Sequence, residues 1–180
     1  MPVFNKHPLF EIIIHARLGV QIYDGEVNTG AFKAAREISN LPIVYNGDVF
    51  EKKDIDRFSD QFGKTDLWMI GRGLLVDPFL PGDIKGMVQE GPAGRKSGIR
   101  KFMDDLYYQY RKALNDRLHS IHLLKELWEY QAFGFNKPKK VFDIVKKSKT
   151  FDEYEDAINI IFEDYEWLGA KANQFNSSLL

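Results

Sequence analysis

Three short apolar runs constrain the fold of this chain most strongly. They are EIIIHAR at residues 11–17, PIVYNGD at 42–48 and DLWMIGRG at 66–73, and each ends in polar or glycine residues. Near-continuous apolar runs are typical of parallel strands that are covered on both faces. Parallel strands need crossover helices, and helical patterns separate these runs. The first part of the chain is therefore predicted to be β-α-β-α-β, with strands at 11–15, 43–45 and 67–70.

The two crossover helices carry their own start and stop signals. The first is predicted to begin after Asn28 or Thr29 as N-cap and to end before Pro42. Its residues Ala31, Ala34, Ala35 and Ile38 are expected to lie on one side. The second is predicted at about residues 51–62, and Gly63 suits the position just beyond its end.

Glycine and proline are concentrated between residues 77 and 98, where they are predicted to interrupt regular structure. We place a domain boundary near residues 86–97. Amphipathic helices follow at about 99–114, at 117–133, from near Asn136 with Pro138 in the first turn, and after a capping box from Thr150 to Glu153. Short loops between such helices favour a bundle. The tail at 173–180 has no packing pattern and is expected to fray.

The charge of the chain is unevenly distributed. The net charge is −1, yet residues 91–150 carry +8, between −3 for residues 1–90 and −6 for residues 151–180. A basic block of this kind indicates a surface that faces a polyanion, and the alternative is a solvated helical face balanced by the acidic last helix. The candidate contacts to a nucleic-acid backbone are Arg95, Lys96, Arg100, Lys101, Lys139 and Lys140.

Several classes of protein are excluded or disfavoured. The chain has no cysteine, which excludes disulfides, thiolate metal sites and a cysteine nucleophile within it. No apolar run approaches the ~20 residues of a membrane span, and no signal peptide is visible, so a cytoplasmic setting is expected. His119 and His122 are spaced for one helix face, but no third ligand completes a metal set, and no metal site is predicted.

The polar strand ends are the candidate ligand site. In β/α-barrels ligands bind at the carboxyl ends of the strands. The three ends are His15-Ala16-Arg17, Asn46-Gly47-Asp48 and Gly71-Arg72-Gly73. Glycine lets backbone N–H groups approach a phosphate, and an arginine binds its oxygens through a planar fork. Each strand end alone could also have a structural role. Gly71 and Asn46 could form ordinary turns, His15 could be a structural histidine at the edge of the sheet, and Arg17 could pair with a carboxylate such as Asp48. Together they favour a site for a phosphate-bearing ligand.

These three segments resemble the C-terminal half of bacterial tRNA-dihydrouridine synthases. The resemblance covers roughly residues 1–82 through EIIIHARLGVQIYDGEVN, PIVYNGDVF and MIGRGLLVDPFLP, and the helical remainder is similar in kind to the family's RNA-binding domain. It implies an α/β fold: the C-terminal part of a (β/α)8 TIM barrel that binds FMN (1–90), followed by an all-α helical bundle that binds tRNA (91–180). It also implies that flavin, reduced by NADPH, delivers hydride to the C5=C6 bond of a uridine extruded from its stack.

The resemblance implies roles for individual residues. Asn46, Gly47, Asp48, Gly71 and Arg72 would hold the phosphate end of FMN, His15 would contact the flavin, and Arg17 matches the family's motif arginine. The family's proton-donating cysteine belongs to the N-terminal half of its barrel and its flavin-contacting lysine to the strand that precedes these three, so no catalytic residue is assigned here. We expect the chain to be a C-terminal portion, inactive alone and prone to self-association through exposed sheet edges.

Two alternatives stay open at this point. One is a non-catalytic RNA-binding fragment, which the missing cysteine favours. The other is a phosphate-binding TIM-barrel enzyme of another kind that acts on a sugar phosphate. The basic helical part argues against the latter, because a small substrate needs no such surface.

Overall fold

The computed structural model of the chain describes residues 1–21, 23, 25–87, 91–169 and 171. The chain forms two compact units, of which one comprises Met1–Leu74 and the other begins at Leu75. The tail at 173–180, which was expected to fray, lies outside the described residues. Within the described part of the chain, no helix has the length and apolar character needed to cross a membrane.

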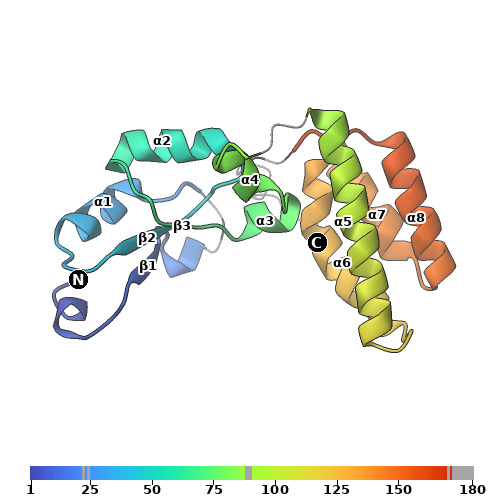
Figure 1. Cartoon of the computed structure of the whole chain (residues 1–180), viewed down its shortest axis with the longest axis horizontal. Helices are drawn as coiled ribbons and strands as arrows, with labels where there is room; N and C mark the ends of the chain where they lie inside the picture. The colour runs from blue at the N-terminus through green and yellow to red at the C-terminus, as the bar shows by residue number, and fades with distance from the viewer. Residues whose placement is uncertain (22, 24, 88–90, 170, 172–180) are drawn as a thin grey trace. The chain divides into compact units, whose positions relative to one another are not determined.

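The first unit is built on a parallel sheet of three strands in the order β1-β2-β3 (Figure 1). The strands are β1 (Ile12–His15), β2 (Ile43–Asn46) and β3 (Trp68–Met69). Helices α1 (Thr29–Glu37) and α2 (Lys52–Phe62) form the crossovers, and short helical turns lie at η1 (Phe4–Lys6) and η2 (Gly19–Gln21). The predicted β-α-β-α-β order and the parallel sheet are confirmed.

An aromatic cluster joins both helices to one face of the sheet. Tyr45 of β2 lies 4.8 Å from Phe32 of α1, 5.0 Å from Phe58 and 4.8 Å from Phe62 of α2, measured between ring centroids. On the opposite face the sheet is less covered, since Ile13 is 49% exposed and Met69 is 44% exposed. The sheet therefore has one packed face and one face with exposed apolar side chains.

The helix ends of this unit follow the predicted signals, whereas the small apolar residues predicted on one side of α1 are not its buried residues. Asn28 caps α1 by accepting a hydrogen bond from the Ala31 N–H at 2.8 Å. Gly63 ends α2 with a φ of 86°, where its N–H bonds to the Ser59 carbonyl. In α1 the fully buried residue is Phe32, while Ala31, Ala34 and Ile38 are exposed. The Phe32 ring contacts Tyr45 and Phe62 and buries more apolar surface than the alanines would, so α1 turns the Phe32 side toward the sheet.

The second unit is helical, as predicted. It contains α5 (Pro92–Ala113), α6 (His119–Gln131), η3 (Ala132–Gly134), α7 (Pro138–Lys147) and α8 (Phe151–Asp164). Its core holds the fully buried side chains of Trp128, Ile99, Leu124 and Ile161, together with Tyr154. Thr150 caps α8 through the Glu153 N–H, but the Glu153 carboxylate returns to the Lys149 N–H rather than to that of Thr150.

The predicted interruption of structure between residues 77 and 98 was wrong in part. A short helix, α4 (Leu80–Ile84), contains Pro81 and Gly82, and α5 already runs from Pro92 through Gly94 and Gly98. Tertiary contacts hold this part of the chain in place. The Arg95 guanidinium is buried and pairs with Asp77 at 3.1 Å and with Asp83 at 2.5 Å.

The segment after Leu74 packs with the helical unit. Gln131 of α6 donates a hydrogen bond to the Leu75 carbonyl at 2.8 Å, and Arg95 of α5 pairs with Asp77 and Asp83 of the same segment. The compact units consequently divide at Leu74, earlier than the sequence-based boundary near residues 86–97. The division into an FMN-binding and a tRNA-binding domain at residue 90 concerns function and stays a prediction.

Candidate functional site

The carboxyl ends of all three strands line one cavity of about 150 Å³. β1 contributes His15, and the end of β2 contributes Asn46 and the four residues that follow it. After β3 come Gly71 and the first two residues of the short helix α3 (Arg72–Val76), Arg72 and Gly73. The predicted convergence of the strand ends is thereby confirmed. The cavity is smaller than the ~300–1,000 Å³ of pockets that enclose whole small molecules, so it suits one end of a ligand.

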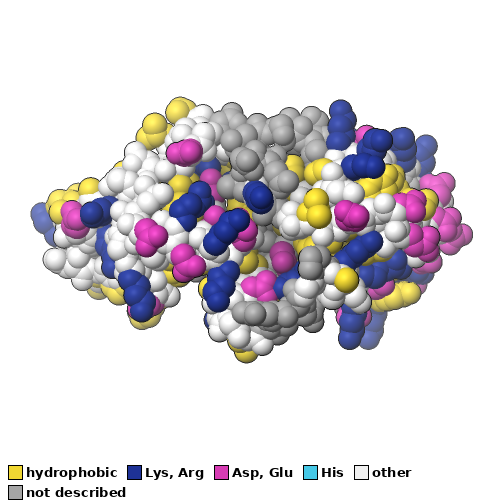
Figure 2. Space-filling model, turned by 90° about the horizontal axis from the view of Figure 1, so that it is seen from above, with side chains coloured by type: hydrophobic (Ala, Val, Ile, Leu, Met, Phe, Trp, Pro, Cys, Tyr) yellow, Lys and Arg dark blue, Asp and Glu magenta, His cyan; other side chains and the backbone are white. Residues whose placement is uncertain are grey.

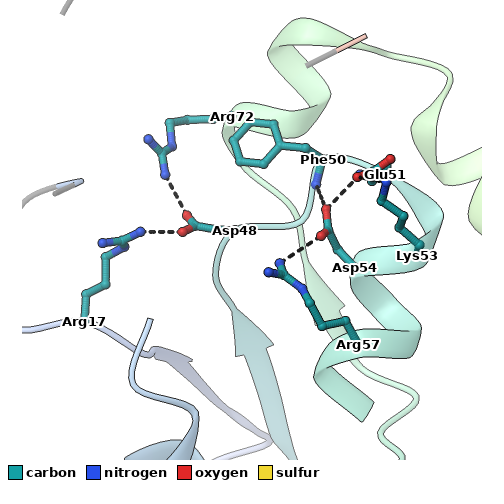
Figure 3. A network of polar contacts seen from close by, with 8 residues as sticks. All are labelled: Arg17, Asp48, Phe50, Glu51, Lys53, Asp54, Arg57 and Arg72. Atoms are coloured by element: carbon teal, nitrogen blue, oxygen red, sulfur yellow. Dashed lines mark hydrogen bonds and ion pairs between the residues drawn. The ribbon is translucent and has the colours of Figure 1, made fainter. Parts of the chain in front are cut away.

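Asp48 joins two of the strand ends by binding two arginines (Figure 3). Its Oδ1 accepts a hydrogen bond from Arg72 Nη2 at 2.7 Å, and its Oδ2 accepts one from Arg17 Nη2. Arg17 also donates to the Gly25 carbonyl at 2.8 Å, and its side chain is only 3% exposed. The pairing of Arg17 with Asp48, an alternative from the sequence, is confirmed. Arg17 is not among the residues that line the cavity.

Arg72 is held from several sides at the cavity. Its Cζ lies 3.9 Å from the centre of the Tyr23 ring and 5.6 Å from that of Phe50. Burial lowers the pKa of the Arg72 guanidinium, and the neighbouring Asp48 carboxylate opposes that shift. Arginine nonetheless stays protonated in proteins. With two guanidinium groups and one carboxylate, the three side chains carry a net positive charge, which attracts an anion.

The rest of the cavity wall combines open backbone with amide and imidazole groups. A Cβ at Gly71 would meet nothing within 4 Å, so the backbone beside Arg72 is accessible. His15 is exposed and lies opposite Asn46 in the β1–β2 pairing. The Asn46 amide makes a weak contact of 3.5 Å with Met69 Sδ. These groups are donors that can serve a ligand bound at the strand ends.

The six candidate RNA-contacting residues fall into different environments. Lys101, Lys139 and Lys140 are exposed and Lys96 is half-buried. Arg100 pairs with Asp104 at 2.7 Å and also donates to Asn159 at 2.9 Å. Arg95 is different, because its guanidinium is buried between Asp77 and Asp83 and holds the fold together. Arg95 is therefore not available to contact RNA.

Basic and acidic side chains are interspersed over the helical unit, on the right of Figure 2. On and beside α7, further exposed lysines are Lys137, Lys146, Lys147 and Lys149. His119 and His122 are both exposed, with ring centroids 6.3 Å apart. Among the residues that the structure describes, no group of three or more histidine, aspartate or glutamate side chains could hold a metal ion.

Sequence reasoning missed the aromatic residues around Arg72. Tyr23 and Phe50 were not assigned to the site, although both lie within the segments that carried the family resemblance. Periodicity cannot find them, because their role depends on contact with an arginine from another strand end. Tyr45 was assigned only as a strand residue, and its contact with Gly47 is likewise invisible in the sequence.

Parallel strands joined by crossover helices, with a cavity at their carboxyl ends and a helical unit after them, are typical of the β/α-barrel class. More specifically, this chain belongs to the Dihydrouridine synthase (Dus) family, whose family model matches residues 9–165. The match extends across both compact units and includes every residue of the candidate site.

Individual relatives agree with this assignment. The chain is 33% identical over 78 residues to a probable tRNA-dihydrouridine synthase of Rhizobium leguminosarum, a match that covers 43% of this chain and 24% of the relative. It is 25% identical over 150 residues to the tRNA-dihydrouridine(16) synthase of Haemophilus influenzae, covering 83% and 47%. It is 24% identical over 161 residues to tRNA-dihydrouridine synthase B of Vibrio cholerae, covering 85% and 48%. The chain thus spans less than half the length of each of these relatives.

Proposed function

We propose that this chain provides the FMN-phosphate site and the RNA-binding helices of a tRNA-dihydrouridine synthase. The reaction is the reduction of the C5=C6 bond of a uridine in tRNA, for which FMN, recharged by NADPH, supplies the hydride when bound. The observation that carries the proposal is the convergence of His15, Asn46 and Arg72 from three strand ends on one cavity.

Arg72 is the principal phosphate-binding residue in this proposal. Its guanidinium lies at the cavity and presents the fork geometry that suits phosphate oxygens. Beside it, the open backbone at Gly71 allows N–H groups to approach the same anion. Asn46 and His15 line the cavity from the other two strands and would contact the cofactor there.

Asp48 and Arg17 act on the ligand indirectly. A phosphate would be repelled by the Asp48 carboxylate, and both Asp48 oxygens already bind arginines. Asp48 therefore fixes the position of Arg72 instead of contacting the phosphate. Arg17 neutralises the second Asp48 oxygen from a buried position, so that the group as a whole keeps a positive charge.

The helical unit supplies the contacts to tRNA. Lys101, Lys139 and Lys140 are exposed, and such side chains bind phosphates without reading the base sequence. The base to be reduced would reach the flavin by leaving its stack. We place this protein in the cytoplasm, with tRNA as its partner.

We expect these 180 residues to bind FMN and tRNA but not to catalyse the reaction by themselves. The chain contains no cysteine, and the resemblance assigns proton donation to a cysteine. The exposed Ile13 and Met69 also leave apolar surface on the sheet, through which we expect the chain to associate with itself.

A non-catalytic RNA-binding protein is the second candidate, and the missing cysteine favours it. A titration of the purified protein with FMN separates the two, with binding followed by the change in flavin fluorescence and with tRNA binding measured on the same preparation. Saturable binding of both FMN and tRNA supports the first candidate. Binding of tRNA in a salt-dependent manner, without binding of FMN, would leave the second.

A further inference from the structure

We infer that Tyr45 is a positioning residue for this phosphate site, whose hydroxyl supports the Asn46-Gly47-Asp48 turn from beneath. The inference rests on the proposed function, because the turn matters for binding only if Arg72 holds a phosphate. Tyr45 itself does not line the cavity. Its influence would reach the ligand through Gly47, Asp48 and Arg72.

The Tyr45 ring is fixed in the core of the first unit. The residue is fully buried, and its ring packs against those of Phe32 and Phe62, each 4.8 Å away, with Trp68 at 5.3 Å. Rings from both helices and a neighbouring strand therefore hold it in one orientation. A side chain held in this way can act as a rigid support.

The Tyr45 hydroxyl is not explained by stability. It is buried and has no hydrogen-bond partner among the described residues. A buried polar group without a partner destabilises a protein, and phenylalanine would fill the same space without that cost. Burial, and then the Asp48 carboxylate, raise the pKa of the Tyr45 hydroxyl above its usual value, so it stays neutral.

The hydroxyl lies directly under Gly47. A Cβ built on Gly47 would lie 2.3 Å from Tyr45 Oη and 2.6 Å from Cζ, so only glycine fits at this position. The hydroxyl oxygen is thus the side-chain atom that lies nearest to this position of the turn. Asp48 follows at once in the chain and binds Arg72 at 2.7 Å. The contact between the Tyr45 hydroxyl and Gly47 therefore fixes the backbone position of Gly47. Through the next residue, it also fixes the position at which the Asp48 carboxylate binds Arg72.

The Tyr45→Phe variant tests this inference. We expect its FMN affinity to fall by about tenfold, an effect typical of losing the support of a binding group. Its thermal midpoint should stay equal to or above that of the wild type, because an unpartnered buried hydroxyl has been removed. Riboflavin, which lacks the phosphate, should bind the variant and the wild type equally. A purely structural role for Tyr45 would not separate the two flavins.

Tyr154→Phe is the matched control. The Tyr154 hydroxyl is also buried, but it accepts a hydrogen bond from Trp128 Nε1 at 3.0 Å. Its loss should lower the thermal midpoint and leave FMN affinity unchanged. Both variants remove a hydroxyl from a buried tyrosine, but only Tyr45→Phe should weaken FMN binding and only Tyr154→Phe should lower the thermal midpoint.

Gly47→Ala approaches the same contact from the other side. Alone it should weaken FMN binding, because the new Cβ clashes with Tyr45. Combined with Tyr45→Phe, it should lose less affinity than the product of the two single losses, since the nearest clashing atom is gone. Part of the loss should remain in the double variant, because Cζ of the ring would still lie 2.6 Å from the new Cβ.

The remaining outcomes are also decisive. Tyr45→Phe with wild-type FMN affinity, or with equal losses for FMN and riboflavin, would overturn the inference while the proposed function stands. A wild-type protein that binds no FMN would overturn the proposed function and the inference together.

Discussion

Arg72, the first residue of the helix that follows β3, donates a hydrogen bond of 2.7 Å to Asp48, which lies two residues beyond β2. The other oxygen of Asp48 binds Arg17, which follows β1. One carboxylate thus connects the segments that follow all three strands, and a single substitution at this position weakens both ion pairs.

Asp48→Asn should destabilise the first unit by about 3 kcal/mol, because breaking a buried ion pair leaves a charge without its partner. The Arg17 side chain is only 3% exposed and cannot reach water to compensate. Urea unfolding followed by circular dichroism measures the effect. The control is Asp60→Asn on the exposed surface of α2, which should stay within about 0.5 kcal/mol of the wild type. A loss below about 1 kcal/mol for Asp48→Asn would mean that the buried pairs contribute little.

Gly134→Ala should destabilise the helical unit by about 3 kcal/mol, the upper range for overpacking. A Cβ at Gly134 would lie 2.0 Å from Cζ3 of the Trp167 ring, which is itself buried. Thermal unfolding provides the measurement. Gly82→Ala is the matched control, since its Cβ would meet nothing within 4 Å. Equal thermal midpoints for the two variants would contradict the packing of Trp167 on Gly134.

Replacing Lys139 and Lys140 together by alanine should reduce the salt dependence of tRNA binding. Each lost phosphate contact lowers the slope of log affinity against log salt by about 1. Filter binding at several salt concentrations measures that slope. The double variant of Lys33 and Lys52, both exposed on the first unit, is the control and should keep the wild-type slope. Identical slopes for both double variants would remove α7 from the proposed RNA surface.

The exposed apolar face of the sheet should make the chain associate with itself at higher concentrations. Ile13 is 49% exposed there, and Ile13→Lys should weaken the association because it places a charge on that face. Sedimentation velocity across a range of concentrations reports the change. Ile160→Lys, at a site 44% exposed on α8, is the control and should associate as the wild type does. A wild-type protein that stays monomeric throughout would refute this prediction.

Local signals predicted much of the fold. The strands were found because their apolar runs are continuous, and Asn28 and Gly63 mark helix ends through their own chemistry. Most of α5 was predicted, at 99–114, but its first turns through Gly94 and Gly98 were missed, because the burial of Arg95 between Asp77 and Asp83 overrides the low helix propensity of glycine. Pairings between residues distant in sequence cannot be read from propensity.

The candidate site shows the same division. Its polar strand ends were identified because parallel strands place their carboxyl ends at one edge, and His15, Asn46 and Arg72 do line one cavity. The stacking of Tyr23 on Arg72 and the contact of Tyr45 with Gly47 were not identified. Both depend on side-chain positions that only the packed core determines.

The most direct test of the account compares the affinities of FMN and riboflavin for the wild type and for Arg72→Ala. Wild type should prefer FMN by at least about tenfold, as expected for charge-assisted hydrogen bonds to the phosphate. Arg72→Ala should lose that preference, while the control Arg57→Ala, on α2 and outside this cavity, should keep it. An Arg72→Ala protein that still prefers FMN as strongly as the wild type would contradict the assignment of the strand ends as a phosphate site.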